Sequence, residues 1–187
     1  IDIVQFIKNI TISFVPLAET KNINLHFNFA DDLNKDDQPI ELYIDVDKIQ
    51  KTVTNLISNA IKYTPENGHV SVSINKINNV TPNPEKSDVK QINKIFGLMI
   101  PHRRNILNNT FQADNFDVKK SSKHVFIEIC VKDDGIGIRD EDLNKIFDRF
   151  YQVAAPHSGH YKSFGIGLAL AKELVELHSG TIHVESV

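Results

Sequence analysis

Several residue types that support other fold classes are scarce in this chain. Among its 187 residues there is one cysteine, Cys130, and no tryptophan. One cysteine excludes an internal disulfide and any metal site built from several cysteines, and it fits a reducing compartment. The longest apolar candidate, residues 95–100, is far shorter than the roughly 20 residues that cross a bilayer. We therefore expect the chain itself to be soluble.

An excess of basic charge is also missing. The chain has 21 Lys and Arg residues against 24 Asp and Glu residues, a formal net charge of -3 at pH 7. Nucleic-acid-binding surfaces are normally basic, so we expect no direct nucleic-acid partner. Hydrophobic residues (41%) and charged residues (24%) stand in ordinary globular proportion, and the length fits one domain that carries an insertion.

Apolar residues recur with helical spacing in some segments and alternate with polar residues in others. Ile3, Phe6, Ile7 and Ile10 predict an amphipathic helix whose last turn Pro16 should loosen. The same patterns predict further helices from the N-cap Asp45 to about Pro65, over 140–147 and over 166–178, and strands over 25–29, 42–44, 70–74, 125–131 and 182–184.

Residues 76–122 form a long Asn- and Lys-rich connection between two predicted strands. Such a connection is unusual in a compact domain unless it is functional or lacks order. The chain therefore reads as one domain, 1–187, with an insertion at about 76–122. Val89, Ile92, Phe96 and Met99 are spaced as in a small amphipathic helix, which would suit either a partner-binding surface or an idle surface insertion.

Asparagines and a lysine share one face of the predicted helix that follows Asp45. Asn55, Asn59 and Lys62 lie in adjacent turns of Asn55-Leu56-Ile57-Ser58-Asn59-Ala60-Ile61-Lys62-Tyr63, while the apolar residues between them turn toward the core. An amide oxygen can coordinate Mg²⁺, and a lysine can pair with a phosphate. A polar, solvated helix face gives the same pattern.

A second segment, Asp133-Asp134-Gly135-Ile136-Gly137-Ile138, follows directly after a predicted strand. Its glycines permit a turn and a close approach of the backbone to a ligand. A carboxylate at the strand end can accept a hydrogen bond from an amino group. Any tight turn could use the same residues, so the pattern alone is weak.

Two further segments stand near the end of the chain. Ile146-Phe147-Asp148-Arg149-Phe150-Tyr151 packs aromatic residues around one arginine, and Ser163-Phe164-Gly165-Ile166-Gly167-Leu168 opens a helix. Backbone N–H groups at a helix N-terminus favour anions, and glycines leave room for phosphate oxygens. The glycine segment is not a Walker A loop, and it lacks the third glycine and the preceding strand of a Rossmann fingerprint.

The four segments, taken in this order, resemble the N, G1, F and G2 boxes in the catalytic domains of sensor histidine kinases. These domains belong to a wider superfamily shared with gyrase, Hsp90 and MutL. The resemblance covers nearly the whole chain apart from 76–122, and residues 14–18 and 172–180 also look like the family. The combination is similar to the kinase domains of hybrid two-component regulators.

The resemblance implies a Bergerat ATP-binding fold, which is a two-layer α/β sandwich with a mixed, mostly antiparallel sheet and helices on one face. It implies ATP and Mg²⁺ as ligands. By similarity, Asp133 accepts a hydrogen bond from the adenine amino group, Asn59 binds Mg²⁺, and Asn55 and Lys62 are the catalytic residues. The nucleotide-binding residues implied in this way are Asn55, Asn59, Lys62, Tyr63, Asp133, Gly135, Gly137, Ile138, Phe147, Arg149, Phe150, Gly165, Gly167 and Leu168.

The reaction implied is transfer of the γ-phosphoryl group of Mg-ATP to a histidine. In the family that histidine belongs to a preceding helical dimerisation segment, and none of the eight histidines here sits in a matching motif. The resemblance further implies a lid over about 151–164, a response-regulator receiver domain as partner, and a dimeric parent protein. It places this domain in the cytoplasm, with the parent anchored in the bacterial cytoplasmic membrane.

The chain departs from the family pattern at three places. Ser163 stands where a glycine is usual, Gln152 stands where an arginine is common, and the sequence stops at Val187 before the family's last strand. These departures leave open a degenerate module that binds nucleotide or protein without transferring phosphate. An ATPase of the gyrase or Hsp90 type is disfavoured, because those enzymes carry a glutamate base where this chain has Asn55.

Overall fold

The computed structural model describes residues 1–29, 39–78, 94–101, 125–153 and 164–186. Within this part of the chain, five strands form one sheet in the order β1-β2-β4-β3-β5. The pair β1–β2 is parallel, and the pairs β2–β4, β4–β3 and β3–β5 are antiparallel. The strands are β1 (Asn24–Phe29), β2 (His69–Asn78), β3 (Lys94–Pro101), β4 (Val125–Asp133) and β5 (Thr181–Ser186).

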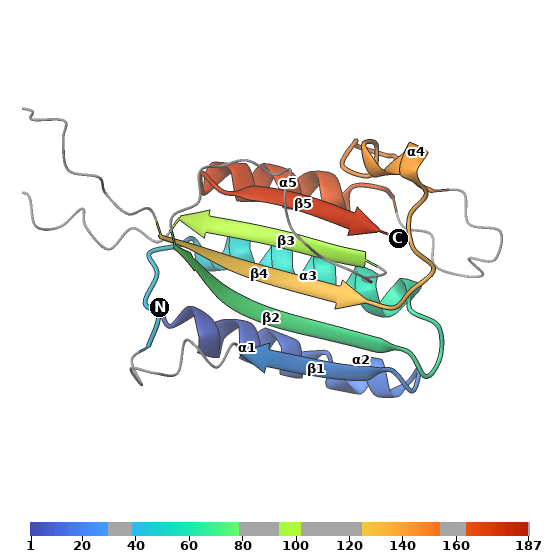
Figure 1. Ribbon diagram of the computed structural model, residues 1–187, viewed down its shortest axis with the longest axis horizontal. Helices are drawn as coiled ribbons and strands as arrows, with labels where there is room; N and C mark the ends of the chain where they lie inside the picture. The colour runs from blue at the N-terminus through green and yellow to red at the C-terminus, as the bar shows by residue number, and fades with distance from the viewer. Residues whose placement is uncertain (30–38, 79–93, 102–124, 154–163, 187) are drawn as a thin grey trace, which may run out of the picture.

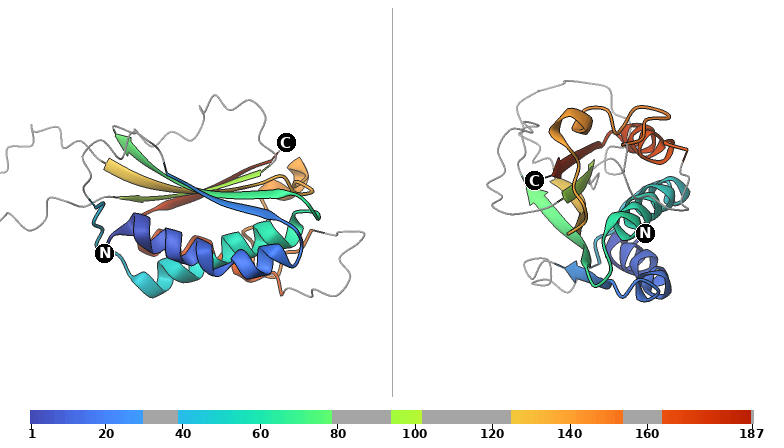
Figure 2. Two further views of the ribbon diagram at one scale, coloured as in Figure 1. Left: turned by 90° about the horizontal axis from the view of Figure 1, so that it is seen from below. Right: turned by 90° about the vertical axis from the view of Figure 1, so that its right-hand side faces the viewer.

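Helices cover one face of this sheet, as Figure 2 shows for α1, α3 and α5. The short helix α4 lies apart from them, beyond the end of the sheet at which β4 finishes (Figure 1). The arrangement confirms the predicted two-layer α/β sandwich with a mixed, mostly antiparallel sheet. The helices are α1 (Ile3–Ser13), α2 (Val15–Glu19), α3 (Val46–Tyr63), α4 (Asp140–Leu143) and α5 (Gly167–Leu177).

Helix ends lie where the capping residues predict them. The Asp2 carboxylate accepts hydrogen bonds from the N–H groups of Val4 and Gln5 at the start of α1. Asp45 accepts from the Lys48 N–H at the start of α3, as expected from the sequence. The first predicted helix divides into α1 and α2, with Pro16 in the first turn of α2, where its missing N–H costs nothing.

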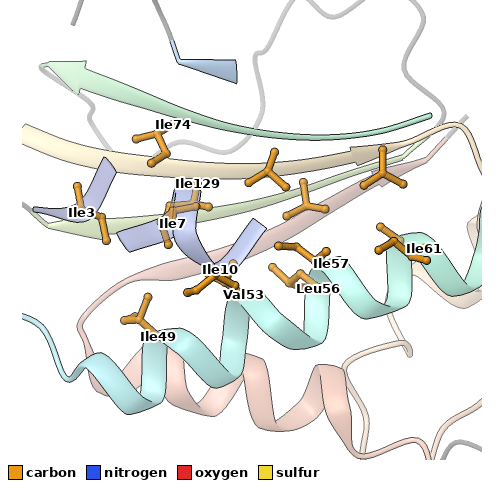
Figure 3. Close-up of a cluster of buried hydrophobic side chains, with 14 of the residues drawn as sticks. Ile3, Ile7, Ile10, Ile49, Val53, Leu56, Ile57, Ile61, Ile74 and Ile129 are labelled. Atoms are coloured by element: carbon orange, nitrogen blue, oxygen red, sulfur yellow. The ribbon is translucent and has the colours of Figure 1, made fainter. Parts of the chain in front are cut away.

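Aliphatic side chains fill the space between the two layers (Figure 3). Ile3 and Ile7 of α1 are fully buried and belong to one cluster with the buried residues of α3 and Ile74 of β2. Each fully buried side chain of this size contributes about 1.5 to 3 kcal/mol relative to an exposed one. The buried residues of α3 are Ile49, Thr52, Val53, Leu56, Ile57, Ala60 and Ile61. The core therefore fixes α3 against the sheet, with its asparagine face turned away.

Lys21 holds the C-terminal end of α3. Its Nζ donates hydrogen bonds to the carbonyl oxygens of Ile61 (2.8 Å), Lys62 (3.1 Å) and Thr64 (2.9 Å). The last carbonyls of a helix have no partner within the helix and carry partial negative charge, so an ammonium group satisfies them well. A lysine that follows α2 thus fixes the turn that leads out of α3.

Two predicted elements are wrong. Phe96 and Met99, assigned to a small helix, lie in β3, where Phe96 pairs with Val131 of β4 and Val184 of β5. A short apolar run fits a buried strand as well as a helix. Here the segment is a strand because it pairs with both β4 and β5. The other half of that helix, Val89 and Ile92, lies outside the described residues.

The predicted strand 42–44 is also absent, and the described residues show there only an isolated bridge between Asp2 and Glu41. Leu42 is nevertheless buried, which explains why an apolar residue stands at this position. Helix α4 ends at Leu143 rather than near Phe147, because the chain turns there to bury Ile146. Among the described residues, no helix is both long and apolar enough to cross a membrane.

Candidate functional site

A cavity of about 340 Å³ opens where α3, the turn after β4, residues 151–153 and the start of α5 meet. Its size is in the range of small-molecule sites. Its walls are mainly apolar, with two asparagines from α3 among them. The lining residues are Asn55, Asn59, Tyr63, Ile136, Gly137, Ile138, Ile146, Tyr151, Gln152, Val153, Phe164, Gly165, Ile166, Gly167 and Leu168.

The asparagine face of α3 forms the polar side of this cavity. Asn59 Nδ2 donates a hydrogen bond of 3.2 Å to Asn55 Oδ1, so the two carboxamides are oriented by one another. Gly167, the first residue of α5, lies directly against the Asn55 carboxamide. A Cβ atom at Gly167 would be 2.4 Å from Asn55 Oδ1, closer than real contacts allow. Glycine at this position therefore lets α5 approach α3.

The turn after β4 is attached to the end of α3. Asp133 is buried, and its Oδ1 accepts a hydrogen bond of 3.0 Å from the Gly135 N–H. The Tyr63 carbonyl accepts from the Ile136 N–H (3.3 Å), and a Cβ atom at Gly135 would be 2.7 Å from that same carbonyl. Gly137 has φ 71°, a left-handed conformation that suits glycine. The turn is thus fixed by contacts that only small residues permit.

The other side of the turn is tied to β2 and β5. The Asp134 carboxylate accepts a hydrogen bond from the His69 N–H (2.7 Å) and lies 3.1 Å from His69 Nδ1. The Ile138 N–H donates to the Ser186 hydroxyl at 2.8 Å. Contacts to two strands, β2 and β5, therefore orient the residues that enter the cavity, Ile136 to Ile138.

The aromatic segment meets the glycine-rich segment at the cavity edge. The Phe150 N–H donates to the Gly165 carbonyl at 2.8 Å, and both residues have positive φ, 66° in each case. A Cβ atom at Gly165 would be 2.6 Å from the Tyr151 carbonyl oxygen. Arg149 forms an ion pair with Glu173 of α5, with 2.6 Å between the nitrogen and oxygen atoms. The two segments are therefore held together at this point.

The structure brings most of the predicted site residues together. Lys62 is half-buried, and its Nζ lies 4.8 Å from the Tyr63 ring centroid rather than in the cavity wall. Asp133 and Gly135 belong to the turn but are not among the lining residues. Phe147 packs against the core, Arg149 is paired with Glu173, and Phe150 is 72% exposed. The predicted residues that line the cavity are Asn55, Asn59, Tyr63, Gly137, Ile138, Gly165, Gly167 and Leu168. Of the predicted lid, residues 154–163 lie outside the described residues.

Seven lining residues were not singled out from the sequence as site residues. Ile136, Phe164 and Ile166 stand beside glycines of the motifs. That position was the one sequence feature that could have marked them as site residues. Ile146 was indistinguishable from a core residue, which it also is. Tyr151, Gln152 and Val153 fall in or beside the predicted lid, but nothing in their identity shows that they face a cavity.

Comparison with known proteins agrees with this geometry. The model of the family of histidine kinase-, DNA gyrase B- and HSP90-like ATPases matches residues 103–187. Sensor histidine kinase WalK of Bacillus subtilis (strain 168) is 33% identical over 154 residues, which is 82% of this chain and 18% of WalK. Histidine kinase P4 of Formosa agariphila is 31% identical over 186 residues, which is 98% of this chain and 10% of P4.

The chain thus spans less than a fifth of the length of either relative. Among solved structures, the catalytic domain of histidine kinase ThkA matches with a TM-score of 0.55 at 15% identity, over 98% of this chain and 90% of that domain. The fold is therefore that of a known kinase domain over almost its full length. Together with the cavity on which the four sequence segments converge, these matches show that the chain belongs to the histidine kinase-like ATPase family, as a histidine kinase catalytic domain.

Proposed function

We propose that this chain binds Mg-ATP in the cavity between α3 and α5 and supplies the catalytic half of histidine phosphorylation in a two-component system. The observation that carries the proposal is the convergence of the asparagine face of α3, the turn after Asp133 and the glycine-rich start of α5 on one cavity. Three segments far apart in the sequence supply polar groups, apolar walls and backbone N–H groups to the same space.

The cavity has the features that a nucleotide requires. Gly167 lies where a Cβ atom would collide with the Asn55 side chain, so the start of α5 is closer to the asparagine face of the site than other residues would allow. Helix α5 has eleven residues, and its first turn, which has no side-chain cap, borders the cavity through Gly167 and Leu168. The N–H groups and dipole at such an end favour phosphate oxygens.

Four of the predicted residues have a specific role in this proposal. The Asp133 carboxylate recognises the adenine amino group, the Asn59 carboxamide would hold Mg²⁺ through its oxygen, and the Asn55 carboxamide lies near the phosphates. Lys62 adds positive charge from the last turn of α3. When bound, Mg²⁺ neutralises charge on the phosphate oxygens. Phosphoryl transfer depends mainly on positioning and charge, which these groups can provide.

Hydrolysis by a general base of this chain is the weaker alternative. The residues that line the described cavity include no aspartate and no glutamate. The Asn55 carboxamide cannot take a proton from water, because its nitrogen is a donor and its oxygen is a very weak base. We therefore favour transfer of the γ-phosphoryl group to a histidine over a gyrase-type ATPase.

The acceptor and the partners belong to the proposal as well. We expect the acceptor histidine on a helical dimerisation segment of the same protein, and a response-regulator receiver domain downstream of it. A dimeric parent anchored in the cytoplasmic membrane fits this arrangement. The chain by itself should bind nucleotide without phosphorylating any of its own histidines.

Calorimetric titration with a non-hydrolysable ATP analogue and Mg²⁺ tests the proposal. Asp133→Asn should abolish most of the binding, because an amide nitrogen would face the adenine amino group. Asp47→Asn, an exposed change on α3 away from the cavity, is the matched control and should bind like the parent. A well-folded parent chain that binds no analogue would refute the proposal and favour a degenerate module.

A further inference from the structure

Asp142 is a buried carboxylate outside all four sequence segments. It lies in α4, and its side chain is 3% exposed. Its Oδ1 accepts a hydrogen bond of 2.5 Å from the Tyr151 hydroxyl, and its Oδ2 accepts one of 2.8 Å from Arg139 Nε. A buried charge is costly unless its oxygens are paired, so these two donors account for its presence.

The charges around this cluster agree with the geometry. The hydrogen bond from Tyr151 and the neighbouring Arg139 guanidinium lower the pKa of the Asp142 carboxyl below its usual range. The same hydrogen bond raises the pKa of the Tyr151 hydroxyl. Arg139 also forms an ion pair of 2.8 Å with Glu141. At neutral pH the Tyr151 hydroxyl therefore keeps its proton and donates it in a hydrogen bond to the ionised Asp142 carboxylate.

Tyr151 connects this cluster to the cavity. Tyr151 is among the lining residues, together with the next two residues, Gln152 and Val153. The residue before it, Phe150, has φ 66°. A left-handed conformation costs a residue of this kind about 1 to 3 kcal/mol, and it persists only where surrounding contacts impose it.

Three hydrogen bonds hold Phe150 and Tyr151 in place among the described residues. One is the hydrogen bond of 2.8 Å from the Phe150 N–H to the Gly165 carbonyl. A second runs from the Tyr151 N–H to the Asp148 carbonyl at 3.3 Å. The third is the hydrogen bond from the Tyr151 hydroxyl to Asp142, which fixes the side chain that follows the strained residue. It is the one of the three that a side-chain substitution can remove, so its loss should loosen residues 151–153 at the edge of the cavity.

We infer that Asp142 is a positioning residue for the nucleotide site, which acts through the Tyr151 hydroxyl to hold residues 151–153 as one wall of the cavity. The inference rests on the proposed function, because nucleotide is the ligand that this wall would contact. Asp142 itself does not line the cavity. Its effect on binding passes through one hydrogen bond.

Tyr151→Phe tests this inference without disturbing α4, because the pair between Asp142 and Arg139 remains. We expect binding of a non-hydrolysable ATP analogue with Mg²⁺ to weaken about tenfold, the order expected when a hydrogen bond to a charged group is lost. Tyr43→Phe is the matched control, since Tyr43 is 82% exposed and does not line the cavity. It should leave binding unchanged.

Asp142→Asn and the double variant separate positioning from general stability. If both residues act through the same hydrogen bond, the double variant should bind no more weakly than the weaker single variant. A purely structural role would lower the melting temperature and leave the affinity of the folded fraction at the parent value. Affinity for Tyr151→Phe within twofold of a binding parent would overturn the inference while the proposed function stands.

A measurement without nucleotide covers the case in which the parent binds none. In amide ¹⁵N spectra of the free protein, Tyr151→Phe should shift the signals of Gln152, Val153 and Gly165. Tyr43→Phe should leave those three signals in place. An unchanged spectrum at these positions would show that the hydroxyl does not position the wall.

Discussion

Gly167→Ala should weaken nucleotide binding strongly while it leaves the fold largely intact. The added Cβ atom would lie 2.4 Å from Asn55 Oδ1, 2.7 Å from Asn55 Nδ2 and 2.9 Å from Asn55 Cγ. Restoring ordinary contact at about 3.5 Å requires the Asn55 carboxamide to move by about 1 Å. That movement also removes the hydrogen bond from Asn59.

The effects on stability nearly cancel. Loss of the hydrogen bond between Asn59 and Asn55 costs about 1 kcal/mol. Alanine in place of glycine in a helix returns about 1 kcal/mol. The collision involves the end of a side chain rather than backbone, so Asn55 can turn aside. We expect the melting temperature to change by less than about 4 °C.

The effect on binding is larger, because the displaced carboxamide lines the cavity. A displacement of about 1 Å in a positioned group can cost up to about a hundredfold. We expect the affinity for the Mg-bound ATP analogue to fall about 10- to 100-fold, which corresponds to about 1.4 to 2.7 kcal/mol. Calorimetry gives the affinity, and thermal unfolding followed by circular dichroism gives the stability.

Asn55→Ala supplies the control. It removes the carboxamide that the new Cβ atom would meet, so Gly167→Ala should have little further effect on affinity in that background. Gly165→Ala provides a contrast, since its Cβ atom would be 2.6 Å from the Tyr151 carbonyl oxygen at a residue with φ 66°. That variant should be destabilised. Equal losses of affinity from Gly167→Ala with and without Asn55 would refute the steric explanation.

Two further predictions concern residues outside the cavity. Lys21→Met removes three hydrogen bonds to the end of α3 and should lower stability by about 1 to 3 kcal/mol, seen as a lower melting temperature that the exposed Lys51→Met does not share. Burial raises the pKa of Cys130 to about 11, so alkylation of this one cysteine at pH 8 should be on the order of a hundredfold slower than that of an exposed thiol of pKa about 8.5. The rate should rise with pH toward 11, and the contribution of Cys130 to stability should fall over the same range. Rapid labelling of the folded chain at pH 8 would contradict the raised pKa of this partly buried thiol.

The sequence alone determined the elements whose residues carry a strong local signal. Helix α3 was predictable because Asp45 caps it and its apolar residues repeat with helical spacing. Strands β2 and β4 were predictable because buried residues alternate along them. The region 94–101 was not, because its apolar run suits a helix or a strand until β4 and β5 pair with it.

The same division holds for the candidate site. The order of the four segments was enough to indicate the family and to name eight residues that line the cavity. The sequence could not show that Arg149 is paired with Glu173, since ion pairing depends on how α5 packs. It also gave no sign of the hydrogen bond between Asp142 and Tyr151, two residues whose identity is ordinary for a helix turn and an aromatic segment.

Local patterns thus determined which segments are helical, extended or glycine-dependent, because propensity, capping and periodicity act over a few residues. The tertiary structure decided which polar groups face the cavity and which are used to hold it together. That choice depends on close contacts such as the one between Gly167 and Asn55, which join residues more than a hundred positions apart. Such contacts exist only once α3, α5 and the sheet have packed, and they are what turns four short motifs into one site.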